Sequence, residues 1–319
     1  KVVATDVELQ GDASTDPELR SLLRTIGPRE GEVLDHRRYE AGKLDVERRL
    51  LERGYFDAEL ERHRVEVRAQ MREANITLHW KSGVRYRFGE TTFEGSHLRQ
   101  ELLDQVVQHE TGTPYEQEAL ITLQRRLTEL DYFGLIDIRP DTDAAADGTM
   151  PIRVGLTPGK RSVYTAGISV GTDAGVGGQL GLERRWVNAR GHKFDAQLDL
   201  AQRRQSIGAR YRIPAFAWAH GWYAIGVNRR EEESEFVRSR ITESVAQRTG
   251  RLGDWELGLG LHVRNESFDL GRDERTVGTG QRRLVYPAVS AARTRADDEL
   301  FPSRGYSMRG ELRVGSGLI

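Results

Sequence analysis

Two hydrophobic rhythms divide the chain near residue 160. Before that point leucines recur at helical spacing, and the clearest stripe is Leu120, Leu123, Leu127 and Leu130. This spacing places the side chains on one face of a helix. After residue 160, apolar and polar residues alternate with the period of two that is typical of β-strands. The sequence therefore predicts an α+β part followed by an all-β part.

The α+β part contains one pattern twice. The pair Tyr55 and Phe56 returns as Tyr132 and Phe133, 77 residues later, and each pair lies between a helix-like run and a strand-like run. Each copy has the order strand, helix, helix, strand, strand. Because sequence repeats form the same supersecondary unit, we expect two domains of β-α-α-β-β topology. We also expect both Tyr-Phe pairs to be structural anchors between helix and sheet.

The predicted strands of the second part have one apolar face and one polar face. About nine of them fit into residues 161–319, each close to the 9–11 residues that cross a membrane in a β-barrel. A soluble sandwich would alternate in the same way, but the strands are long and consecutive, which favours a barrel. Aromatic residues lie near strand ends, as in the interfacial girdles of such barrels: Trp186, Trp218, Trp222, Tyr223, Trp255 and Tyr306.

The connections between these strands are predicted to alternate between compact and long. The segment Asn-Ala-Arg-Gly-His at 188–192 is short, whereas 229–236 and 265–283 are rich in charge and glycine. We expect the two long segments to be loops. The acidic stretch at 230–235 is expected to be a solvated loop as well.

Composition and motifs narrow the chemistry. The chain has no cysteine, which excludes disulfides and thiolate metal sites, and its net charge of −1 gives no reason to expect nucleic acid. The eight histidines lack zinc-binding spacing. Residues 167–171 match a hydrolase nucleophile motif, but that motif needs a strand–turn–helix context, and Ser169 lies in an alternating strand. We therefore expect no catalytic, cofactor or metal site.

Together these features resemble the Omp85 superfamily of outer-membrane proteins. Residues 1–83 and 84–160 are similar to POTRA domains, and residues 161–319 resemble the first part of an antiparallel transmembrane barrel. The likeness is strongest to the TamA branch, through a set of residues in the first barrel strands: Gly167, Thr172, Asp173, Gly175, Trp186, Asn188, Gly191 and His192. That branch has three POTRA domains and sixteen barrel strands. We therefore expect a longer protein, of which this chain holds two POTRA domains and about nine strands.

The resemblance implies an assembly or translocation factor in the outer membrane of a Gram-negative cell, with POTRA domains in the periplasm. In the family, the first barrel strand forms a lateral seam to which a client strand is added by β-augmentation. That strand maps to Tyr164, Ala166, Gly167, Ile168 and Val170. The edge strands of the POTRA domains, which would dock a partner, map to Ala58, Leu60, Val65, Leu135, Ile136 and Ile138.

The resemblance also implies the partners. These are a periplasm-spanning TamB-like protein, unfolded outer-membrane or autotransporter clients, the lipid bilayer and lipopolysaccharide. Nucleic acid is not among them. No cofactor is implied, so the free energy for insertion would come from the folding of the client or from a partner.

Three alternatives remain open from the sequence. A two-partner-secretion transporter also joins two POTRA domains to a barrel, and would carry a plug helix and linker before Lys1. A patatin-type lipase fusion would carry an α/β-hydrolase-like domain there. A soluble β-rich binding protein would be extracted by plain buffer rather than by detergent.

Overall fold

The computed structural model describes residues 1–172, 174–216, 220–234, 236–272, 275–297 and 301–318. By its contacts the chain divides into two compact units. The first comprises Lys1–Gly95, Val107–Glu129 and Leu135–Leu156, and the second comprises Ser96–Val106, Leu130–Gly134 and Thr157–Ile319. The second β-α-α-β-β domain contributes to both units, because its short helix and its Tyr-Phe turn group with the large C-terminal sheet.

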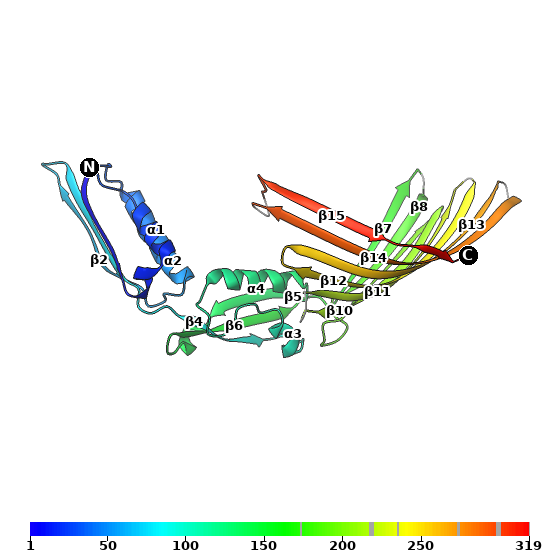
Figure 1. Ribbon diagram of the computed structural model, residues 1–319, viewed down its shortest axis with the longest axis horizontal. Helices are drawn as coiled ribbons and strands as arrows, with labels where there is room; N and C mark the ends of the chain where they lie inside the picture. Colours follow the sequence, from blue (N-terminus) through cyan, green and yellow to red (C-terminus); the bar gives the residue numbers. More distant parts are fainter. Residues whose placement is uncertain (173, 217–219, 235, 273–274, 298–300, 319) are drawn as a thin grey trace. The chain divides into compact units, whose positions relative to one another are not determined.

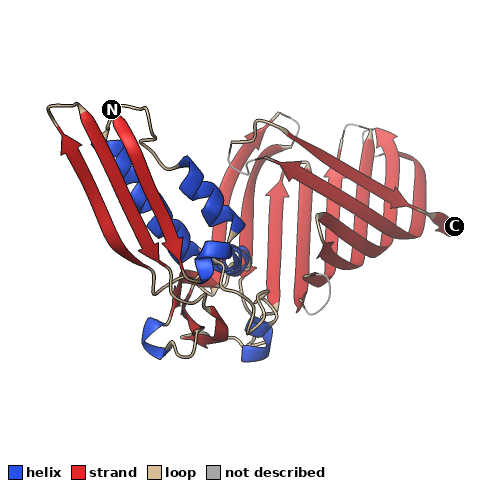
Figure 2. Ribbon diagram, turned by 60° about the vertical axis from the view of Figure 1, so that its left-hand side comes forward, coloured by secondary structure: helices blue, strands red, loops and turns tan. Residues whose placement is uncertain are grey.

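The first domain is a three-stranded sheet with two helices against one face (Figure 2). Its elements are β1 (Val2–Gln10), η1 (Asp12–Thr15), α1 (Pro17–Thr25), α2 (His36–Glu52), β2 (Glu59–Arg68) and β3 (Glu73–Lys81). The strand order is β1-β3-β2, with β1 parallel and β2 antiparallel to β3. The carboxylate of Asp16 caps α1 by accepting hydrogen bonds from the N–H groups of Glu18 (3.0 Å) and Leu19 (3.4 Å).

The core of this domain lies between the helices and the sheet. Leu19, Val46 and Leu50 of the helices meet Ile76, Leu78 and Trp80 of the central strand, and all six side chains are buried. The alternation along β3 produces this core, because every second residue from Ala74 to Trp80 faces the helices. Burial of these apolar side chains is the main source of the domain's stability.

The second domain repeats this topology. It consists of β4 (Arg87–Glu94), α3 (Gln100–Asp104), α4 (Gln117–Glu129), β5 (Phe133–Pro140), η2 (Thr142–Ala144) and β6 (Thr149–Pro158). The strand order is β4-β6-β5, and β4 is parallel to β6. The predicted leucine stripe forms the buried side of α4, with Leu120, Leu123 and Leu127 all buried.

The large sheet is an antiparallel meander (Figure 1). Its strands are β7 (Ser162–Gly171), β8 (Gly175–Arg184), β9 (Lys193–Ala201), β10 (Arg204–Ala215), β11 (Gly221–Glu233), β12 (Val237–Leu252), β13 (Trp255–Arg272), β14 (Arg275–Ala296), β15 (Gly305–Arg313) and β16 (Ser316–Leu318). In the described residues nine strands, β7 to β15, follow one another in sequence order, and β16 pairs with β14. The prediction of two β-α-α-β-β domains followed by about nine antiparallel strands is confirmed.

Two predicted loops are wrong. Most of 229–236 and 265–283 belongs to strands, because β11 runs to Glu233, β12 starts at Val237, and β13 and β14 pair from Trp255↔Arg293 to Arg272↔Arg275. The acidic stretch is therefore a ladder rather than a loop, although Glu235 lies outside the described residues. Ion pairs across the ladder support it, with 3.0 Å between Glu231 and Arg240 and 3.0 Å between Glu233 and Arg238. Charged residues lie on both faces of β11 from Arg229 to Glu233, which removed the alternating signal there.

Candidate functional site

The seam predicted from the sequence lies on β7, which is an edge strand of the large sheet. Within the described part of the chain, β7 pairs with β8 only. Tyr164, Ala166, Ile168 and Val170 lie on the exposed apolar face, and Ile168 is 94% exposed. Gly167 lies on the opposite face, where an added Cβ would come within 2.7 Å of the side-chain nitrogen Nε2 of Gln179. An edge of this kind presents backbone N–H and C=O groups to another strand.

Side-chain pairing along β7 changes from one end to the other. At its start Tyr164 lies opposite Leu182, and Val163 lies opposite Glu183. Toward its end three of the five partners in β8 are glycines, opposite Ile168, Ser169 and Gly171, whereas Gly167 lies opposite Gln179 and Val170 lies opposite Val176. Because cross-strand side-chain pairs stabilise a sheet, the second half of β7 is held more weakly than the first.

The POTRA strands predicted to be docking edges are β2 and β5. Each pairs with a single strand in its three-stranded sheet, β2 with β3 and β5 with β6. In the first domain Ala58, Leu60 and Val65 are half-buried against the core. In the second domain Ile136 and Ile138 are half-buried, whereas Leu135 is 63% exposed. Both strands have the open backbone edge that β-augmentation requires.

The first Tyr-Phe pair has one residue inside its domain and one at the boundary to the next. Tyr55 is 2% exposed and belongs to the first core. Phe56 instead packs edge-on against Tyr86 and Tyr115 of the second domain, with ring centroids 5.5 and 4.9 Å apart. Burial raises the pKa of Tyr115 to about 12. Gly54, at φ +83°, allows this approach, because a Cβ there would lie 2.8 Å from Cβ of Tyr115.

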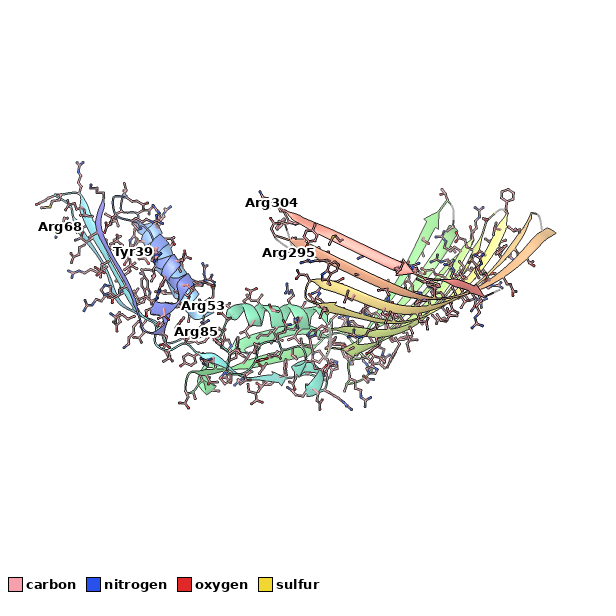
Figure 3. All side chains as sticks on the ribbon, in the orientation of Figure 1. Tyr39, Arg53, Arg68, Arg85, Arg295 and Arg304 are labelled. Carbon is pink, nitrogen blue, oxygen red and sulfur yellow. The ribbon has the colours of Figure 1, made fainter. Side chains whose placement is uncertain are left out.

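Charged groups surround this junction (Figure 3). Arg53 lies 2.6 Å from the buried carboxylate of Asp16 and 3.6 Å from Glu116. Arg85 donates to Glu116 at 2.5 Å and to the carbonyl of Arg53 at 3.0 Å. Two arginines from the first domain and the linker therefore share one carboxylate of the second domain, which orients the two domains.

The second Tyr-Phe pair holds a turn of the large sheet. Tyr132 is fully buried and donates its hydroxyl hydrogen to the carbonyl of Gly191, in the turn between β8 and β9. Burial holds the pKa of Tyr132 well above its usual value. Phe133 lies 6.2 Å from the ring of His97, which in turn lies 4.0 Å from the ring of Trp186. Both pairs thus contact the next module along the chain as well as their own.

The polar face of the large sheet lines an open cavity of about 820 Å³. Asp195 lies between Arg210 (3.0 Å) and Arg212 (3.1 Å). Farther along the sheet, His262 Nδ1 lies 2.9 Å from Glu243, and the Tyr286 hydroxyl donates to the same carboxylate at 2.8 Å. A polar, ion-paired face opposite an exposed apolar face is the arrangement of a membrane barrel with a wet interior.

The predicted aromatic girdle lies at one end of this sheet. Because successive strands are antiparallel, Trp186, Trp222, Tyr223, Trp255 and Tyr306 all lie at the end where β7 begins. Trp218, which was also predicted, is outside the described residues, as is Asp173 of the TamA-like set. Two arginines lie over these rings, Arg248 over Tyr223 at 5.1 Å and Arg293 over Trp255 at 5.6 Å.

The remaining candidates from the sequence are a nucleophilic serine, a metal site and a membrane-spanning helix. Ser169 lies in β7, without the strand–turn–helix context of a nucleophile. Among the described residues, no three His, Asp or Glu side chains are grouped in a way that could hold a metal ion. Searching the same residues gives no helix that is both long enough and apolar enough to cross a membrane.

Comparison with known proteins gives the class. Residues 2–83 match the family model "POTRA: Surface antigen variable number repeat". The crystal structure of BamA from Haemophilus ducreyi lacking POTRA domains 1–3 superimposes with a TM-score of 0.74 at 12% identity, over 97% of this chain and 62% of that one. CdiB from Escherichia coli gives 0.51 at 13% identity, over 99% of this chain and 59% of that one.

These similarities define the class of fold. Residues 2–83 match the POTRA family model, and the chain as a whole shares its fold with the BamA and CdiB structures. The chain spans about three fifths of the length of the two solved structures. Neither similarity selects the TamA branch.

Three charged residues at the junctions were not foreseen from the sequence. Arg53 and Arg85 follow helix and strand ends, where a solvated cation is the ordinary expectation. Lys193 starts an alternating strand, yet it is only 4% exposed. A usable signal existed for Arg53 alone, since it lies two residues before the repeated pair Tyr55-Phe56.

Proposed function

We propose that this protein assembles or secretes β-rich client proteins at the outer membrane of a Gram-negative cell. The large sheet lies in the membrane with its apolar face toward lipid, and the POTRA domains lie in the periplasm. The observation that carries the proposal is a POTRA match followed by an antiparallel sheet of nine described strands with an exposed apolar face. A sheet of this kind matches the requirements of a lipid environment.

The proposed site of action is the free edge of β7. A client strand that enters hydrocarbon must pair every backbone N–H and C=O, since each unpaired group costs several kcal/mol. Pairing with β7 satisfies one side of the client strand at once. Three glycines among the five β8 partners leave the second half of β7 with few side-chain pairs, so a client strand can compete there. No chemical step is required, and the free energy comes from the client's own pairing and burial.

We assign partner docking to β2 and β5, because both are open edges of POTRA sheets. The finer proposal is a TamA-like factor that docks a periplasm-spanning TamB-like partner and acts on unfolded outer-membrane or autotransporter clients, in contact with lipid and lipopolysaccharide. The fold shared with CdiB favours one second candidate, a two-partner-secretion transporter. Photo-crosslinking from Leu135 separates the two: a periplasm-spanning partner supports the first, and a secreted passenger supports the second.

Two neighbouring proline substitutions test the seam. Successive N–H groups of a strand point to opposite edges, so one of Gly167→Pro and Ile168→Pro removes an N–H from the free edge, and the other removes one from the β8 ladder. We expect one of the two to lower client assembly by at least about tenfold, which corresponds to about 1.4 kcal/mol, while heat-modifiable migration shows an intact barrel. Equally mild effects of both substitutions on assembly would contradict a seam at β7.

A further inference from the structure

The turn between β8 and β9 carries four of the eight TamA-like residues, and strand pairing alone does not explain them. We call residues 185–193 the docking turn. Within it the Asn188 carboxamide accepts hydrogen bonds from the N–H groups of Arg190 (2.9 Å) and His192 (3.4 Å). The Val187 N–H donates to the His192 carbonyl at 2.7 Å. These three hydrogen bonds lie within the turn and fix its shape.

Two segments of the second domain form hydrogen bonds and an ion pair with the docking turn. From the α3 region, the N–H of Arg99 donates to the Ala189 carbonyl at 2.9 Å. From the Tyr-Phe turn, the Tyr132 hydroxyl donates to Gly191, and Asp131 pairs with Arg185 at 3.0 Å. Gly191 is in the left-handed region at φ +73°, and a Cβ there would lie 2.8 Å from the Tyr132 hydroxyl. Only glycine allows this contact.

Lys193, the first residue of β9, contacts the Tyr-Phe turn from the large sheet. Its ammonium donates to the Leu130 carbonyl at 2.6 Å and lies 4.7 Å from the Tyr132 ring and 5.6 Å from the Trp222 ring. The side chain is 4% exposed, and burial of a cation is costly unless it is paired. A carbonyl and two aromatic faces meet that requirement only while the Tyr-Phe turn stays in place. Separation of the Tyr-Phe turn from Lys193 would break this hydrogen bond and both cation–ring contacts.

The docking turn also holds the beginning of the seam strand. Arg161 directly precedes β7, and its guanidinium donates to the carbonyls of Trp186 (3.3 Å) and Val187 (2.9 Å). The Arg185 N–H in turn donates to the Arg161 carbonyl at 2.9 Å. The first half of β7 is thus bonded to the docking turn through Arg161, whereas three of the five partners of its second half in β8 are glycines.

We propose that the docking turn is a permanent clamp that fixes the start of β7, so that the seam opens only from its far end. Lys193, Tyr132 and Arg161 are then positioning residues, which set where a client strand can enter. The inference rests on the proposed function for its consequence, but the clamp itself can be measured without any client. The proposal predicts that the contacts between the docking turn and the second domain persist during client assembly.

Hydrogen exchange of the full-length protein in lipid nanodiscs tests the clamp directly. In the wild type we expect amides of residues 162–166 to exchange at least about tenfold more slowly than those of 167–171. Lys193→Met removes the buried cation at similar length and should remove this protection in 162–166, leaving 167–171 unchanged. Lys160→Met is the matched control, because Lys160 is exposed near the same end of the sheet. Unchanged exchange of 162–166 in Lys193→Met would overturn the clamp.

A second variant covers the case in which Lys193→Met does not fold. Tyr132→Phe removes only the hydroxyl that donates to Gly191, and it should produce the same loss of protection in smaller measure. Heat-modifiable migration shows whether the barrel is folded in each variant. If Tyr132→Phe folds and leaves the exchange of 162–166 unchanged, the docking turn does not hold β7 and the proposal fails.

A cross-link tests whether the clamp stays closed. The chain has no cysteine, so a cysteine pair at Arg99 and Ala189 forms the only disulfide. We expect the oxidised protein to keep client assembly within about twofold of the reduced protein. Activity that is lost on oxidation and returns on reduction would show that the clamp must open, and would overturn the proposal. A wild type that assembles no client would refute the proposed function and leave the exchange result standing.

Discussion

The two Tyr-Phe turns are copies in sequence, yet they join different neighbours by different means. At the first, Phe56 packs on aromatic rings of the second POTRA domain, and two arginines share Glu116, which is 42% exposed. At the second, the Tyr132 hydroxyl and the buried Lys193 hold a turn of the large sheet. The first junction combines aromatic packing with partly exposed ion pairs, and the second combines buried hydrogen bonds with one partly exposed ion pair.

The two copies share the contacts inside their own domain and differ in the contacts to the neighbouring domain or sheet. Both copies place a buried tyrosine after the second helix, because that position anchors helix to sheet in either domain. The contacts beyond the domain follow the neighbour instead. Exposed ion pairs are weak and screened by salt, whereas buried bonds are not. The ion pairs of the first junction are therefore expected to be more sensitive to salt than the buried hydrogen bonds of the second.

Removal of the anchor tyrosines should have the largest effect. Tyr55 and Tyr132 are 2% and 0% exposed, and truncation of a buried aromatic side chain to alanine costs about 3–5 kcal/mol. Tyr132→Ala also deprives the Gly191 carbonyl of its donor, so it should be the more costly of the two. Hydrogen exchange of the full chain measures both. We expect faster exchange near residues 46–56 for Tyr55→Ala, and near 99–103 and 188–193 for Tyr132→Ala. If both variants changed hydrogen exchange only in the first domain, Tyr132 would not hold the turn of the large sheet, and the proposed difference between the two junctions would be wrong.

An aspartate at Gly54 should have an intermediate effect. Position 54 corresponds to Asp131 in the second copy, and both residues have positive φ, +83° and +55°. At position 54 a Cβ would lie 2.8 Å from Cβ of Tyr115, and overpacking of this kind costs about 1–3 kcal/mol. We expect Gly54→Asp to accelerate exchange at 53–57 and 113–117. The double variant Gly54→Asp with Tyr115→Ala should show less additional loss than the two single changes together. Full additivity would mean that the side chains do not clash.

Much of the fold was predictable because it rests on local periodicity. The leucine stripe from Leu120 to Leu130 predicts α4, and the alternation after residue 160 predicts the strands from β7 onward. The predictions for 229–236 and 265–283 were wrong because the charged, polar and glycine residues there are not confined to alternate positions, so the period of two is lost. Their pairing depends on cross-strand bonds that composition does not reveal.

The candidate site was predictable only where a repeat or a strand edge marked it. The buried tyrosines follow from the repeat, and the position of β7 follows from the alternation. Lys193 could not be found, because its burial depends on the Leu130 carbonyl, 63 residues earlier in the chain. Arg85 likewise acquires its role from Glu116, which is distant in sequence. Long-range pairs of this kind leave no local pattern.

The smallest effect is expected for the reverse exchange, Asp131→Gly. Glycine relieves the left-handed backbone of Asp131 and removes its ion pair with Arg185, whose side chains are 45% and 25% exposed. Glycine also gives the unfolded chain more freedom, which opposes the relief. These contributions offset one another, so we expect a net change within about 1 kcal/mol. Arg185→Gln is the control that removes the same ion pair without altering the backbone. Exchange at 130–134 should therefore change less in Asp131→Gly than exchange at 53–57 does in Gly54→Asp. A cost for Asp131→Gly equal to that of Gly54→Asp would mean that the carboxylate, rather than Tyr132 and Lys193, carries the second junction.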